Sequence, residues 1–144
     1  MNKQTSLVFL IVVFLSNINS FFIQPPFLYA NTFGSFLKKC REEYKLENYE
    51  KALELCDKAI ILNSINNPEA FAQRALIKHF LNDNYGSISD LSIAIKINPK
   101  IAYFYWNRAI SFERIGDTES ACNDLKVGSR LNHKQSIERY SLLC

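Results

Sequence analysis

The sequence predicts an all-α fold, an α-solenoid in which helical hairpins stack along one axis. Two observations support this prediction: a long segment of the chain repeats itself, and within each repeat the apolar residues recur at the three- and four-residue spacing of a helix. The composition agrees with it. The chain of 144 residues has only four Gly and four Pro, little turn-forming material for a sheet, and its 48% of apolar residues is ample for one packed domain.

The repeat is clearest in the second half of the chain. Residues 68–101 align without a gap onto residues 102–135, and Arg74, for example, meets Arg108. The same pattern returns upstream with one extra residue in its closing turn, so a third copy precedes these two. We therefore predict three repeats, at about residues 33–67, 68–101 and 102–135.

Each repeat is expected to be a helix–turn–helix hairpin. Short polar side chains stand in the turns inside the hairpins, at Asn48, Asp83 and Asp117, where they can cap the next helix. Pro68 stands at a first helical position, which tolerates its missing N–H. A stack of hairpins also needs a helix over its last apolar face, and residues 134–143 supply one. The predicted helices lie near residues 34–46, 49–63, 68–81, 85–97, 102–115, 118–131 and 134–143.

Residues 44–53, with the sequence YKLENYEKAL, resemble the stretch Y-K-x-G-D/N-Y-x-x-A-I of the tetratricopeptide-repeat (TPR) family. Residues 106–109 and 114–117 match the family pattern in the third repeat. The resemblance covers residues 34–133, and it is to the short exported bacterial members of the family.

The resemblance implies a right-handed solenoid whose concave face is lined by the first helix of each hairpin. It also implies a scaffold that binds a protein or peptide partner. The lysine and asparagine of TPR domains that bind chaperone tails are not reproduced, because Leu37 and Arg41 stand at those positions in the first repeat. Binding of a cytosolic chaperone is therefore disfavoured.

Residues 1–30 are typical of a signal peptide. Lys3 gives a positive start, and an unbroken apolar run follows that is too short to span a bilayer. Cleavage after Ala30 would leave residues 31–144 as the TPR domain, and Ser20 is a second candidate cleavage position. The alternative is an uncleaved membrane anchor. We expect an exported protein (periplasmic, lumenal or secreted) without membrane attachment once the signal is cleaved.

The chain has four cysteines, an even set that favours disulfides in an exported protein. Of the three possible pairings, the repeat register favours Cys40 with Cys56 inside the first hairpin, and Cys122 with Cys144 between the last hairpin and the capping helix. The resemblance supports the second pair, because short exported bacterial TPR proteins often close with a similar A-C-x-D…C ending. The alternative is a set of buried free thiols.

The sequence carries no motif of catalysis. His79 and His133 lack partners at metal-ligand spacing, and no glycine-rich phosphate loop is present. Asp90 and Asp124 recur at one repeat position and are most simply interpreted as solvated or turn-facing. The formal net charge of +3 is scattered, which gives no basic run for nucleic acid. We therefore expect no enzymatic activity, cofactor, metal or nucleic-acid partner.

The candidate binding residues are those that the repeat register places on the concave face. They form a cationic end in the first repeat and an aromatic end in the third. Such a groove suits a peptide with an acidic residue or a C-terminal carboxylate at one end and apolar residues at the other. The candidates are Leu37, Lys38, Arg41, Lys45, Gln73, Leu76, His79, Phe80, Tyr103, Trp106, Asn107, Ile110 and Arg114.

Two interpretations of these residues remain open. They can form a binding surface, or Tyr103 and Trp106 can belong partly to the core, with the cations serving only solubility. Two function classes also remain open. The first is a scaffold or adaptor that binds a peptide or protein segment. The second is a structural subunit or assembly factor of an envelope or membrane complex, docked through its convex face and capping helix.

Overall fold

The computed structural model describes residues 26–63 and 66–144, with side chains from residue 32 onward. This part of the chain holds seven helices and no strand, so the predicted all-α class is confirmed. The observed bounds agree with the predicted ones to within one residue, except at the start of the first helix. The helices are α2 (Pro26–Lys45), α3 (Tyr49–Leu62), α4 (Pro68–Phe80), α5 (Asn84–Ile97), α6 (Ala102–Arg114), α7 (Thr118–Arg130) and α8 (Lys134–Leu143).

The first helix, α2, begins at Pro26 rather than near residue 34. Proline is well suited to a first helical position, because its missing N–H has no partner to lose there. As a result α2 contains Ala30, the first of the two candidate cleavage positions. The rest of the predicted signal, residues 1–25, lies outside the described residues. None of the described helices combines the length and the apolar character needed to cross a membrane.

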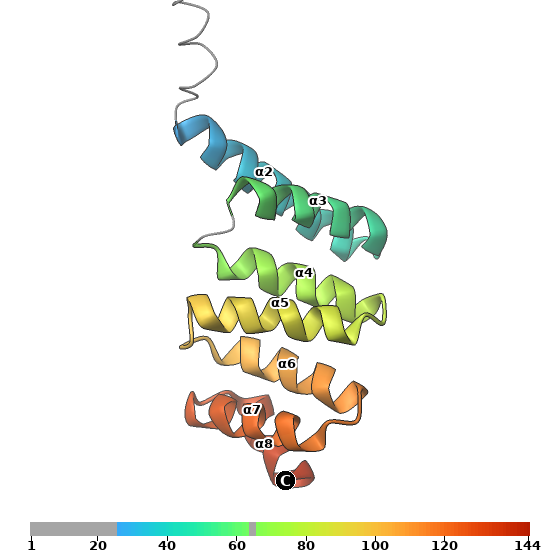
Figure 1. Cartoon of the computed structure of the whole chain (residues 1–144), viewed down its shortest axis with the longest axis vertical. Helices are drawn as coiled ribbons and strands as arrows, with labels where there is room; N and C mark the ends of the chain where they lie inside the picture. The colour runs from blue at the N-terminus through green and yellow to red at the C-terminus, as the bar shows by residue number, and fades with distance from the viewer. Residues whose placement is uncertain (1–25, 64–65) are drawn as a thin grey trace, which may run out of the picture.

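The helices form three hairpins that stack in chain order, α2–α3, α4–α5 and α6–α7, with α8 at the end of the stack (Figure 1). Each helix packs against the next one in the chain, and the first helices of neighbouring hairpins also meet, α2 with α4 and α4 with α6. The capping helix α8 packs on α7, as predicted. This arrangement is a solenoid, because each hairpin contacts only its neighbours.

The turns inside the second and third hairpins are capped by aspartates. Asp83 accepts a hydrogen bond from the backbone N–H of Gly86 at 2.8 Å, and Asp117 accepts one from Ser120 at 3.0 Å. The predicted cap at Asn48 is wrong. Its side-chain amide donates instead to a carboxylate oxygen of Glu43, at 2.8 Å, and its side chain makes no capping hydrogen bond to the start of α3.

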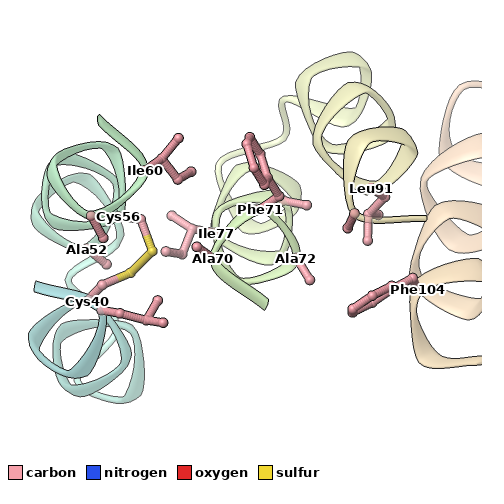
Figure 2. Close-up of a cluster of buried hydrophobic side chains, with 14 of the residues drawn as sticks. Cys40, Ala52, Cys56, Ile60, Ala70, Phe71, Ala72, Ile77, Leu91 and Phe104 are labelled. Atoms are coloured by element: carbon pink, nitrogen blue, oxygen red, sulfur yellow. A yellow bond between two sulfur atoms is a disulfide. The ribbon is translucent and has the colours of Figure 1, made fainter. Parts of the chain in front are cut away.

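Small residues allow the helices of each hairpin to pack closely. Ala52, Ala75, Ala109 and Ala121 are fully buried at these crossings. The main core cluster runs through the first two hairpins and ends on Phe104 of α6 (Figure 2). A second, smaller cluster lies between α6, α7 and α8. The core is therefore a chain of interfaces along the stack, as a repeat protein requires.

The interpretation of Asp90 and Asp124 as solvated residues is wrong, because both are buried, with 2% and 5% exposed. Arg74 donates two hydrogen bonds to Asp90, at 2.8 and 2.6 Å, and Arg108 donates two to Asp124, at 2.7 and 2.8 Å. These forked contacts offset the loss of hydration that burial imposes on a carboxylate. The recurring aspartates are thus internal links between the two helices of a hairpin.

The four cysteines come together in the predicted pairs. Cys40 and Cys56 have Cα atoms 5.4 Å apart, and their sulfur atoms lie at disulfide distance (Figure 2). Cys122 and Cys144 have Cα atoms 5.8 Å apart, again with the sulfur atoms at disulfide distance. Both Cα separations are in the usual range for disulfides. The first pair joins α2 to α3, and the second joins α7 to the residue that follows α8.

Candidate functional site

Two adjacent cavities follow the first helices of the hairpins, and together we call them the groove. The smaller one, about 160 Å³, opens where α2, α4 and α6 meet. The larger one, about 260 Å³, lies between α4, α5 and α6. Leu76 lines both, so the cavities are neighbours. The smaller cavity is lined by Arg41, Glu69, Ala72, Gln73, Leu76, Tyr103 and Phe104. The larger cavity is lined by Leu76, His79, Phe80, Ser87, Trp106, Asn107, Ile110 and Ser111.

The larger cavity combines apolar walls with hydroxyl groups that already have partners. Leu76 and Ile110 occupy the same position of successive repeats, so the solenoid places them side by side on α4 and α6. Ser87 and Ser111 are each 1% exposed, and their Oγ atoms lie 3.0 Å apart. This hydrogen bond links α5 to α6 and leaves the buried hydroxyls satisfied.

The aromatic walls of this cavity are held by rings outside it. Phe80 stacks on Tyr49 with the ring centroids 5.2 Å apart, and it meets the edge of Tyr44 at 5.7 Å. Trp106 contacts the ring of His133, at the start of α8, with the centroids 5.6 Å apart. Phe80 is thus fixed by the first hairpin and Trp106 by the capping helix, although Phe80 is 51% exposed.

Of the predicted groove cations, Arg41 lines the smaller cavity, and Lys38, Lys45 and Arg114 each lie within about one helical turn of a lining residue. Lys38 lies 3.9 Å from Glu42, a weak exposed pair. Arg41, Lys45 and Arg114 are exposed and have no ion-pair partner among residues 32–63 and 66–144. Within the cavity-lining set, Glu69 is the one acidic residue. The groove therefore has an excess of positive charge around an apolar cavity.

The surroundings of His79 favour the uncharged form of its imidazole. Partial burial lowers the pKa of its imidazole, and the nearby charge of Arg114 lowers it further. Its Nδ1 atom is buried without a hydrogen-bond partner, as are Gln73 Nε2 and Asn84 Oδ1. A neutral ring adds apolar character to the larger cavity at physiological pH.

Most of the predicted groove residues line the two cavities. They are Arg41, Gln73, Leu76, His79, Phe80, Tyr103, Trp106, Asn107 and Ile110. Lys38, Lys45 and Arg114 lie outside the linings. The placement of Leu37 in the groove is wrong. It is 6% exposed and packs in the core, because α4 of the next hairpin covers its position on α2.

Sequence reasoning missed five residues of the linings: Glu69, Ala72, Ser87, Phe104 and Ser111. The repeat alignment contains a signal for the serines, since small residues recur where helices cross, but it does not show that a crossing borders a cavity. Across the described segments, no three His, Cys, Asp or Glu side chains gather as a metal site would require.

Comparison with known proteins points in one direction. No protein-family model matches the chain. A TPR repeat-containing protein of Methanocaldococcus jannaschii is 36% identical over 77 residues, which is 54% of this chain and 13% of that protein. The TPR repeat-containing thioredoxin TDX of Arabidopsis thaliana is 27% identical over 99 residues, which is 69% of this chain and 26% of that protein. The chain thus spans a small part of either relative.

Solved structures share the fold at low sequence identity. The Arabidopsis OM64 TPR domain has a TM-score of 0.75 at 21% identity, with 80% of this chain and 96% of that chain covered. The first TPR of Spaghetti (RPAP3), bound to an HSP90 peptide, has 0.74 at 18%, with 78% and 90% covered. The Yersinia enterocolitica type III secretion chaperone SycD, in complex with a peptide of the translocator YopD, has 0.72 at 16%, with 78% and 89% covered.

The stacked hairpins and the capping helix define a short α-solenoid of three repeats. Its sequence is similar to that of TPR repeat-containing proteins, and it shares the fold of solved TPR domains.

Proposed function

We propose that this domain is a non-catalytic scaffold that binds a peptide or protein segment along the groove. The observation that carries the proposal is the pair of adjacent cavities, which has apolar walls and a border of exposed cations. Such a surface favours an extended segment with apolar side chains and negative charge. Two structures of similar fold support it, since one is bound to an HSP90 peptide and the other to a YopD peptide.

The groove does not need a conformational change to receive a segment. Phe80 and Trp106 are already held by neighbouring rings, and the hydroxyls of Ser87 and Ser111 already have partners. Binding then orders few protein side chains, which limits the entropy lost on association. A rigid, partly apolar surface of this kind is suited to binding rather than to group transfer.

We further propose that the domain acts outside the cytoplasm with both cysteine pairs oxidised. Disulfides persist in oxidising compartments, and the sulfur atoms of both pairs lie at disulfide distance. Peptide mapping without reductant, on protein purified from its native host, should recover Cys40 linked to Cys56 and Cys122 linked to Cys144. Recovery of free thiols from such a preparation would contradict this proposal.

The second candidate function, a structural subunit of an envelope complex, has some support outside the groove. Ile61 is 83% exposed, Tyr85 74% and Leu142 81%, and they come from three different helices. Apolar groups that are scattered singly are common on soluble proteins, so these residues support a docking face less strongly than a continuous surface would. Reversal of charge on two different faces of the solenoid separates the two functions.

The test compares two doubly charge-reversed proteins. In the first, Arg41→Glu and Lys45→Glu reverse the charge at the cationic border of the groove. In the second, Lys96→Glu and Lys126→Glu make the same charge change on α5 and α7, where both lysines are exposed. A partner captured from the native envelope fraction should be lost with the first variant and retained with the second. The opposite result would place the interface on the second helices of the hairpins and favour the structural subunit.

A further inference from the structure

We propose that the larger cavity is an anchor pocket for a single aromatic side chain, presented by a partner segment that is acidic next to that side chain. The inference rests on the proposed function, since it names the ligand of the same groove. Four features of the molecule support it: the size of the cavity, the chemistry of its walls, their rigidity and the surrounding charge.

The size of the cavity indicates one side chain. Sites for drug-sized ligands and cofactors range from roughly 300 to 1,000 Å³. At about 260 Å³ the cavity lies below that range, and the smaller cavity next to it, at about 160 Å³, is separated from it by Leu76. A side chain inserted from a bound segment fits these dimensions better than a free cofactor does. The smaller cavity would take a shorter side chain of the same segment.

The walls of the cavity favour an aromatic ring. Leu76 and Ile110 form an aliphatic surface, and Phe80 and Trp106 provide two ring surfaces. Rings pair favourably in offset and edge-to-face arrangements, so an aromatic side chain gains more here than an aliphatic one of similar area. The buried hydroxyls of Ser87 and Ser111 bond each other, so an apolar ring can cover them without leaving an unpaired polar group.

The rigidity of the walls supports the same ligand. Phe80 is half-exposed, yet Tyr49 stacks on it with an interplanar angle of 9° and Tyr44 contacts its edge. His133 holds Trp106 from the other end of the solenoid. These contacts come from the first hairpin and from the cap, outside the cavity. The pocket is therefore shaped before the ligand arrives, as a binding hot spot requires.

The positive charge around the cavity favours acidic residues beside the aromatic residue of the ligand. Arg114 follows Ile110 by one turn of α6, Arg41 of α2 lines the smaller cavity, and Lys45 follows Arg41 by one turn of α2. None of the three has an acidic partner within the described residues, so their charges are available to a ligand. A partner with acidic residues beside its anchor is attracted, whereas a basic segment is repelled.

The experiment selects peptides from a random displayed library on the full chain, purified with its cysteines paired. We expect enrichment of peptides that carry one aromatic residue next to acidic residues. Replacement of that aromatic residue by alanine, in a synthetic copy of the selected peptide, should weaken binding roughly 30-fold. Replacement by leucine should weaken binding less than alanine does.

Three protein variants place the peptide. Ile110→Trp fills the cavity and should abolish binding, whereas Ile93→Trp makes the same change on α5 outside both linings and should leave it intact. Phe80→Ala removes a half-exposed wall of the cavity and should weaken the binding of peptides that carry the aromatic residue. This variant provides a second test in case Ile110→Trp does not fold. Circular dichroism and melting temperature establish folding for each variant.

The outcomes distinguish this inference from the proposed function. In one outcome, Arg41→Glu abolishes peptide binding, but alanine at the aromatic position of the peptide leaves the affinity unchanged. This outcome would overturn the anchor pocket and leave the proposed scaffold function in place. Binding that is lost with Arg41→Glu but equal in Ile110→Trp and Ile93→Trp proteins would do the same. Failure to enrich any peptide, or binding that no groove variant changes, would overturn both.

Discussion

Different contacts link the two helices of the first and of the second hairpin. In the second, Arg74 links α4 to α5 through Asp90 and also donates to Asp57 of the preceding hairpin, at 2.7 Å. In the first, the positions equivalent to Arg74 and Asp90 hold Lys39 and Leu55, which cannot form that pair.

In the first hairpin the link lies one residue further along each helix, where Cys40 meets Cys56. An internal hairpin has a neighbour on each side, so one arginine can tie three helices together. Among the described residues no hairpin precedes the first one, and the proposed disulfide between its own two helices would not depend on a neighbour. The two hairpins thus share a repeat register but not the contacts that link their helices.

The largest predicted effect concerns the central ion pair. Asp90→Ala should lower the free energy of unfolding by about 3–5 kcal/mol, the usual loss when one member of a buried pair is removed. Arg74 and Lys78, whose side chains are only 19% and 20% exposed, would both lose this carboxylate. Urea unfolding measures the change.

The third hairpin supplies the control for this prediction. Asp124→Ala removes the carboxylate from Arg108 alone, and Arg108 keeps a hydrogen bond to the hydroxyl of Ser92 at 2.9 Å. We expect a smaller loss than for Asp90→Ala. Equal losses would show that the number of cations around the aspartate does not affect the free energy of unfolding. The central aspartate would then stabilise the protein no more than the aspartate of the third hairpin.

The next effect tests the proposed disulfide of the first hairpin. Joint replacement of Cys40 and Cys56 by alanine should lower the free energy of unfolding by about 3 kcal/mol, because the bond closes a short loop in the unfolded chain. Urea unfolding of oxidised protein measures it. The matched measurement adds reductant to the unaltered chain, which should lose at least as much. Stability that is indifferent to reductant would show that the cysteines are not bonded.

The third effect concerns the groove. Trp106→Ala should lower affinity for a groove-binding peptide by about 2 kcal/mol, as loss of an aromatic hot spot does. Arg41→Ala should cost less and should make binding less dependent on salt, because its charge lies at an exposed border. Affinity and Tm must be measured together, since Trp106 also packs against the second, smaller core cluster. Unchanged affinity in a folded Trp106→Ala protein would move the binding surface elsewhere.

Much of this molecule could be predicted from the repeat register. Helix spacing and capping residues give the hairpins, and equivalence between repeats indicates which residues share a face. Register does not show what covers that face. Leu37, Ala72 and Trp106 are equivalent, yet the first two are buried under the next hairpin, while Trp106, followed only by the cap, remains partly exposed.

The same limit explains the two aspartates. Periodicity places Asp90 and Asp124 on the second helices of their hairpins, but their burial depends on long arginine side chains that reach across from the first helices. The long apolar stem of an arginine lets its guanidinium group reach a buried carboxylate where two helices cross. A sequence pattern shows only that the position holds a charged residue. Contacts of this kind involve residues far apart in the sequence, and helical spacing alone does not predict them.

The smallest predicted effect is a pH dependence of stability that arises in the second hairpin alone. Equivalent positions hold Tyr44, His79 and Glu113, so the second hairpin alone has an imidazole there. Burial and the charge of Arg114 lower the pKa of His79 in the folded protein, relative to the ordinary value of 6.5. The unfolded chain therefore takes up a proton first as the pH falls. Stability from His79 is present above about pH 6.5 and is lost as the pH falls toward the lowered pKa. Urea unfolding at about pH 7.5 and 5.5 should show a smaller acid loss for His79→Gln than for the unaltered chain, because the contributions of the shared carboxylates cancel in the difference. An equal or larger loss in His79→Gln would show that His79 does not contribute to the acid sensitivity.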